Sequence, residues 1–109
     1  MRYLFAVMAD RRAVVTADTV EMAAIDAFNE RLEAAGQRVI ALGVAGPDRA
    51  VVFDHRGDTA QVTAGPLVDA DDFMNGFWVV EVDDEATAFA LAAEASHACN
   101  RRIEVRPIL

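Results

Sequence analysis

The stretch that decides the fold is FWVVEV at residues 77–82, in which aromatic and β-branched residues mark a β-strand. Side chains alternate along a strand, so positions 78, 80 and 82 share one face and positions 77, 79 and 81 share the other. Each face carries large apolar side chains, and the first predicted strand, residues 2–8, shows the same two-sided pattern. Neither face of the predicted sheet is polar, so both faces need a cover.

Two helices are predicted to cover one of these faces. The first follows a capping box, with Asp18 as N-cap and Glu21 three residues later, and ends at Gly36. The second is capped by Asp83 or Asp84 and runs to about residue 98. The residues predicted to face the sheet are Met22, Ile25, Phe28, Leu32 and Ala35 in the first helix, and Ala86, Phe89, Ala90 and Ala93 in the second.

The remaining segments complete the order of elements. Further strands are predicted at residues 39–42, 50–53, 60–63 and 103–106, and a turn at 54–58 makes a hairpin of the middle two. Residues 67–75 are predicted to be an irregular, acidic loop, and Asn100 to stop the second helix. The resulting order is that of an α+β, ferredoxin-like fold, βαββαβ with an added hairpin strand. We expect residues 1–109 to form a single domain.

The helices of this fold lie on one side, which leaves the other apolar face of the sheet bare. A chain of 109 residues buries only part of its surface, so a second copy is a natural source of further burial. We therefore expect a homodimer in which the two sheets pack on each other around a two-fold axis.

The charge balance excludes several classes of function. The net charge is −8, and all ten basic residues are arginine. A uniformly acidic domain repels phosphate groups, so neither nucleic acid nor an anionic membrane is expected as a partner. The absence of lysine excludes Schiff-base and phosphate-loop chemistry, and no cofactor is expected.

The apolar stretches and the single cysteine predict where the protein resides in the cell and whether it binds a metal ion. Charges interrupt every apolar stretch well before membrane-spanning length, and the charges at residues 10–12 argue against a signal peptide. The single cysteine, Cys99, fits the reducing cytoplasm. No Cys-x-x-Cys motif or histidine cluster is present, so no metal site is expected.

Six segments, in this order and spacing, carry a resemblance to a known family: MRYL at 1–4, FNERLEAAG at 28–36, VTAGPL at 62–67, NGFW at 75–78, VEVDD at 80–84 and IEVRP at 103–107. Together they resemble the YCII-related family, in the branch named for an Asp-Gly-Pro-Phe (DGPF) motif. The resemblance implies a dimeric α+β barrel with a cleft beside the Gly-Pro loop. It also implies relatives that include small cofactor-free enzymes, one of them dehydrochlorinase-like, and bacterial members encoded beside sigma factors.

The chain departs from the family pattern at two positions that bear on catalysis. The motif reads Ala-Gly-Pro-Leu at residues 64–67, so Ala64 stands in place of the acid. The other branch carries a histidine in the first helix as half of a His–Asp dyad, and the corresponding residue is Ile25. General acid–base chemistry needs a titratable group within reach of the substrate, so these replacements favour binding over catalysis.

The predicted ligand pocket consists of Gly65, Pro66, Phe77, Glu81 and Arg106. Gly65 and Pro66 would shape the loop, and Arg106 would anchor a carboxylate through two parallel hydrogen bonds. Glu81 would have a raised pKa if it were buried without a partner, as a general base requires. The alternative for Glu81 and Arg106 is an Arg–Glu pair that bridges neighbouring strands or subunits.

Asp69 is the candidate catalytic residue, because it stands where the family often has an acid after its motif. With Asp71 and Asp72 it forms an acidic cluster whose oxygens are the ligands that hard cations prefer. The spacing fits no calcium-loop pattern, and solvated loop charge is the simpler interpretation.

Two functions stay open at this point. The first is a non-catalytic dimeric module that binds a small molecule or a protein partner in the cleft. The second is a cofactor-free enzyme, a lyase or isomerase that acts on a compact aromatic or acidic substrate. A third possibility is regulation of a sigma factor. The acidic surface of this chain would then dock onto a basic surface of the sigma factor.

Overall fold

The computed structural model describes residues 1–12 and 18–109. Along the chain, each of the two α-helices is preceded and followed by a β-strand. The elements, in chain order, are β1 (Arg2–Asp10), α1 (Thr19–Ala34), β2 (Arg38–Gly43), the short 3-10 helix η1 (Pro47–Arg49), β3 (Val51–Asp54), β4 (Gln61–Ala64), β5 (Asp72–Glu81), α2 (Glu85–Cys99) and β6 (Arg102–Pro107).

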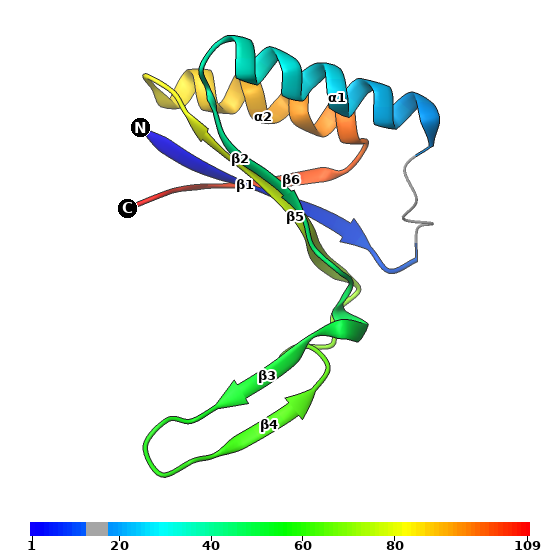
Figure 1. Ribbon diagram of the computed structural model, residues 1–109, viewed down its shortest axis with the longest axis vertical. Coiled ribbons are helices and arrows are strands. Elements are labelled where there is room, and N and C mark those ends of the chain that lie inside the picture. Colours follow the sequence, from blue (N-terminus) through cyan, green and yellow to red (C-terminus); the bar gives the residue numbers. More distant parts are fainter. Residues whose placement is uncertain (13–17) are drawn as a thin grey trace.

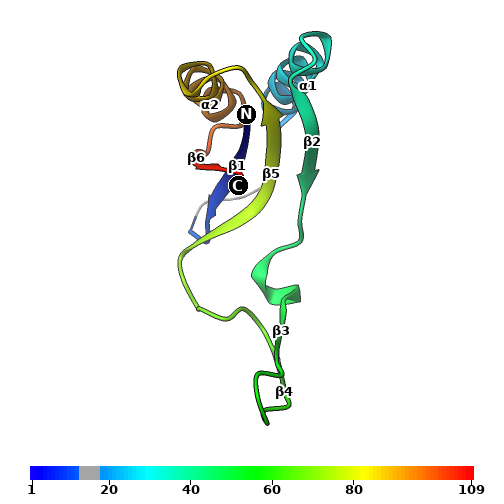
Figure 2. The ribbon, with the colours of Figure 1, turned by 90° about the vertical axis from the view of Figure 1, so that its left-hand side faces the viewer.

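Four of the strands form one sheet in the order β2-β5-β1-β6, and every neighbouring pair is antiparallel. Both helices lie on the same side of this sheet (Figures 1 and 2). This is the predicted α+β arrangement with a ferredoxin-like layout. The sheet of one chain is open, so a barrel requires a second copy.

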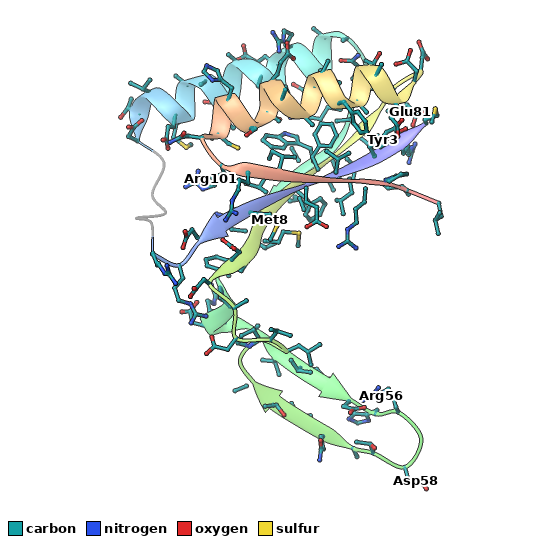
Figure 3. All side chains as sticks on the ribbon, turned by 180° about the vertical axis from the view of Figure 1, so that it is seen from behind. Tyr3, Met8, Arg56, Asp58, Glu81 and Arg101 are labelled. Atoms are coloured by element: carbon teal, nitrogen blue, oxygen red, sulfur yellow. The ribbon has the colours of Figure 1, made fainter. Side chains whose placement is uncertain are left out.

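The added hairpin does not join the main sheet. Strands β3 and β4 pair as a separate two-stranded sheet, from Val51 opposite Ala64 to Asp54 opposite Gln61. We call residues 51–64 the arm; it projects away from the helices (Figure 1), and Figure 3 shows Arg56 and Asp58 at its tip. The arm gives the chain a radius of gyration of 15.9 Å, compared with about 13 Å for a compact chain of this length.

The core lies between the helices and the main sheet. Across the central strands, Phe5 is opposite Trp78 and Tyr3 is opposite Val80, and all four side chains are buried. Figure 3 shows Tyr3 between the sheet and the helices, and Met8 on the opposite, helix-free side. The predicted alternation along residues 77–82 is therefore confirmed.

Helix α1 follows its sequence signals closely. Asp18 is the N-cap and accepts a hydrogen bond of 2.8 Å from the backbone N–H of Glu21. Gly36, just beyond the helix, has a φ of 68°, which favours glycine. Phe28 and Leu32 are buried against the sheet and Ile25 is half-buried. The prediction is wrong for the two end positions: Met22, in the first turn, is 50% exposed, and Ala35, the C-cap residue, is exposed.

The predicted inner stripe of α2 is wrong. Ala86, Phe89, Ala90 and Ala93 are exposed, and the residues that face the core are Ala88, Ala92, Ala95 and Cys99. Alanine occupies both faces of this helix, so hydrophobic periodicity does not distinguish them. The small side chains face the sheet, and the large ring of Phe89 is 52% exposed.

The prediction of an irregular loop over residues 67–75 is wrong in its second half. Strand β5 begins at Asp72, well before the predicted start at residue 77. A register shift between Val7 and Met8 of β1 places Gly76 opposite Val7 and Met74 opposite Met8, so Asn75 is an extra, bulged residue. The bulge and the two acidic residues at 71–72 hide the strand from pattern analysis.

Gly76 occupies the tightest backbone position of the main sheet. A Cβ atom there would lie 2.8 Å from the carbonyl oxygen of Leu42 in β2, closer than real Cβ contacts. We expect Gly76→Ala to lower the free energy of unfolding by about 1–3 kcal/mol, because backbone must shift to admit the methyl group. Chemical denaturation of both proteins measures the difference. Gly43→Ala in β2 is the control for loss of glycine, because a Cβ there lies 3.9 Å from the carbonyl oxygen of Asn75, an ordinary van der Waals contact.

Candidate functional site

A pocket of about 320 Å³ opens between α1, the end of α2 and the strands β2 and β5. Its size is at the lower end of the range for small-molecule sites. Apolar lining residues come from four elements and include Val7, Ile25, Ala41 and Trp78. The polar lining side chains are Asn29, Asn75 and Arg101, and the Cys99 thiol completes the wall.

Trp78 joins the core to this pocket. Its indole N–H donates a hydrogen bond of 2.8 Å to Oδ1 of Asn29, and its ring meets Phe28 edge to face at a centroid distance of 5.3 Å. The bond fixes the Asn29 amide on α1, because the oxygen is the acceptor. The NH2 group of Asn29 is then the end of the amide that can donate to a ligand.

Arg101 lies in the turn from α2 into β6 (Figure 3). Asn100 stops the helix with a φ of 52°, as predicted, and turns the chain toward the sheet. The turn is held by a hydrogen bond of 2.6 Å from the hydroxyl of Ser96 to the carbonyl oxygen of Arg101. Arg101 itself is half-buried and donates from Nη1 to the carbonyl oxygen of Cys99 at 2.8 Å.

Cys99 is buried and remains a protonated thiol at neutral pH. Burial raises the pKa of the Cys99 thiol, and the hydrogen bond and positive charge of Arg101 oppose this shift only in part. The thiolate is the reactive form of cysteine, so the wall of the pocket offers a weakly polar surface rather than a nucleophile.

Gly65 and Pro66 lie at the base of the arm, apart from this pocket. Gly65 has a φ of 100° and donates from its backbone N–H to the carbonyl oxygen of Ala50 at 2.8 Å, closing the arm. Pro66 borders a second hollow of about 360 Å³, whose other lining residues are Arg11, Gly46, Pro47, Asp48 and Phe73. The Gly-Pro loop therefore shapes a hollow of its own.

The other three predicted pocket residues do not meet at the loop. Phe77 lies on the helix-free side of β5 and contributes to the edge of the 320 Å³ pocket. Glu81 is exposed and accepts from Nε of Arg2 at 3.1 Å across the β1–β5 pair, while Arg106 pairs with Glu104 on its own strand at 2.7 Å. For Glu81, the structure matches the alternative of an ion pair between neighbouring strands.

The acidic cluster is neutralised by arginines. Asp69 pairs with Arg11 at 2.6 Å, Asp71 pairs with Arg12 at 2.6 Å, and Asp72 pairs with Arg102. The Asp69 side chain is 80% exposed, so it lies in solvent rather than in an enclosed site. Within residues 1–12 and 18–109, no group of three or more histidine, cysteine or acidic side chains is placed to hold a metal ion.

Comparison with known proteins places the chain in a family. The model of the YCII-related domain matches residues 1–109. The chain belongs to the YCII-related domain family. A search of the curated proteins finds no match to this YCII-related chain. None of its described helices is both long and apolar enough to cross a membrane.

The polar residues that line the pocket of this YCII-related domain were not among the residues predicted from its sequence. Asn29 and Asn75 have no sequence signature, because each acquires its position from a helix face or a strand bulge. Arg101 directly follows Asn100, the residue that ends α2. A basic residue at the C-terminus of a helix is commonly explained by its interaction with the helix dipole, so it does not stand out as a ligand-binding residue. Ile25, identified as the position of the missing histidine, does line the pocket.

Proposed function

We propose that this chain is a non-catalytic, homodimeric binding module of the cytoplasm, which takes a small molecule in the 320 Å³ pocket beside Ile25 and Trp78. The observation that carries the proposal is the chemistry of the pocket wall. Among the described residues that line it, the polar groups are amides, a guanidinium and a protonated thiol, with no carboxylate or imidazole. Such a wall supports binding and orientation, but it offers no group that exchanges a proton near neutral pH.

The branch of the family is part of the same proposal. Ala-Gly-Pro-Leu at residues 64–67 occupies the place of the DGPF motif. Ala64 stands at the acid position of the motif and Ile25 at the histidine position, so neither position supplies a titratable side chain.

The homodimer is supported by two exposed apolar surfaces. On the helix-free face of the main sheet, Leu42 pairs with Phe77 and Leu4 pairs with Val79, and Leu42 is 49% exposed. On one face of the arm, Val51, Phe53, Val62 and Ala64 lie together, and Phe53 is 69% exposed. A two-stranded hairpin is marginally stable alone in water, so this arm gains stability by packing on another surface. A second copy supplies that surface, and two sheets facing each other would form the dimeric α+β barrel.

A thermal-shift screen of single-ring organic compounds tests the binding function. We expect at least one compound to raise Tm, by roughly 10 °C when it is present at about 100 times its Kd. The same mixtures, analysed by mass spectrometry after prolonged incubation, should contain the compound unchanged.

The cofactor-free lyase or isomerase is the alternative outcome of this screen. Turnover by the wild-type protein that disappears in Asp69→Ala would replace the binding module with the enzyme. Glu94→Ala is the matched control, because Glu94 also pairs with an exposed arginine, Arg31 at 2.5 Å, far along the chain from the Gly-Pro loop.

A further inference from the structure

The arginines of this chain divide into those with carboxylate partners and those without. In the part of the chain that the structure describes, Arg49 and Arg101 are the arginines that form no ion pair. Residues 13–17 contain no acidic residue that could serve as a partner. Arg49 is exposed on η1, where water solvates its charge, but Arg101 is half-buried in the wall of the pocket.

The guanidinium of Arg101 has donors to spare. One of its five N–H groups is used by the carbonyl oxygen of Cys99 at 2.8 Å. The nearby Glu21 carboxylate accepts from the side-chain amide of Asn100 at 3.3 Å and forms no ion pair with Arg101. A partly desolvated cation without a counter-charge is costly, so the pocket favours a ligand that supplies the negative charge.

The rest of the wall completes a site for an organic anion. The NH2 group of Asn29 is left as a donor because its oxygen is held by Trp78, and Asn75 adds a second amide from the bulge of β5. Val7, Ile25 and Ala41 provide an apolar surface next to these donors. A volume of about 320 Å³ suits a body of one ring rather than an extended chain.

We propose that the pocket binds a compact carboxylate with a single-ring or similarly small apolar body, and that Arg101 holds the carboxylate. The proposal rests on the proposed binding function and names the ligand class. The carboxylate would accept charge-assisted hydrogen bonds from the guanidinium, and the ring would lie against Trp78 and Ile25.

The test compares benzoate with benzamide, which has nearly the same shape but no charge. Trp78 is the only tryptophan of the chain and lines the pocket, so its fluorescence reports occupancy of this site, and isothermal titration gives the affinities. We expect wild-type protein to bind benzoate at least tenfold more tightly than benzamide, with a change in Trp78 emission. Arg101→Gln should weaken benzoate binding by about 10- to 100-fold and leave benzamide binding unchanged, since a hydrogen bond to a charged group is lost.

Arg49→Gln is the matched control, because it removes the other arginine without an ion pair and should leave both affinities unchanged. Arg101→Lys, which keeps the charge but not the two parallel donors, should retain part of the preference and serves if Arg101→Gln folds poorly. Benzamide binding as tightly as benzoate, or an unchanged benzoate affinity in Arg101→Gln, overturns the anion site while the binding module stands. If neither compound changes Trp78 fluorescence at millimolar concentration, the anion site is also overturned. The binding function itself is overturned only if no compound in the thermal-shift screen raises Tm.

Discussion

Replacing Trp78 with alanine should lower the free energy of unfolding by about 3–5 kcal/mol. The side chain is 5% exposed, packs edge to face on Phe28 at 5.3 Å and donates a hydrogen bond to Asn29. Its removal leaves a cavity between α1 and β5 and an amide oxygen without its partner. Domains of this size are stable by about 5–15 kcal/mol, so the variant should lose a large share of its stability.

The measurement is chemical denaturation followed by circular dichroism, because the variant has no tryptophan for fluorescence. Trp78→Phe is the matched control: it keeps most of the ring volume, loses the hydrogen bond to Asn29, and should cost only about 1 kcal/mol. If the alanine and phenylalanine variants are equally stable, the indole does not anchor α1 to the sheet as the structure indicates.

Replacing Phe53 with aspartate should raise the dimer dissociation constant about 30-fold or more, if the arm packs on a second copy as proposed. Phe53 is 69% exposed in one chain, so a charge there should scarcely change the stability of the monomer. At a contact between copies, the same charge would be buried without a partner. Analytical ultracentrifugation over a range of concentrations gives the constant.

Thr63→Asp provides the control for this experiment. Thr63 lies on the same arm but on its opposite face, paired with Val52, so the added charge is the same and the apolar face is intact. We expect this variant to dimerise like the wild type. An unchanged constant in Phe53→Asp would exclude the arm from the contact, and a wild-type protein that is monomeric at micromolar concentration would remove the homodimer altogether.

The parts of the fold that could be predicted from sequence are those with a local cause. Asp18 and Glu21 mark the start of α1, and Gly36 marks its end, because each acts on backbone within one turn. Alternation over residues 77–82 gives the two faces of β5. The start of β5 could not be predicted, because it depends on pairing with β1 across a bulge. The inner face of α2 could not be predicted, because alanine occurs on both faces of that helix.

The site could be predicted less well than the fold, for the same reason. Charged residues were candidates by type, but their partners come from the strand register: Arg2 lies opposite Glu81 only once β1 and β5 are aligned. Likewise, Arg11 meets Asp69 only after the arm has placed its base beside the end of β1. Arg101 matters because no carboxylate in the described part of the chain pairs with it, and sequence patterns carry no information about a missing partner.

The strand order has a consequence for how the protein avoids uncontrolled association. One outer strand, β6, presents Arg102, Glu104 and Arg106 and ends at Pro107, features that discourage a foreign strand from adding to a sheet. The other outer strand, β2, presents Val39, Ile40 and Leu42, and within the described residues it pairs only with β5. A strand from another chain is therefore discouraged from adding at β6 but can add at β2. We expect aggregation to begin at β2 when the chain is partly unfolded.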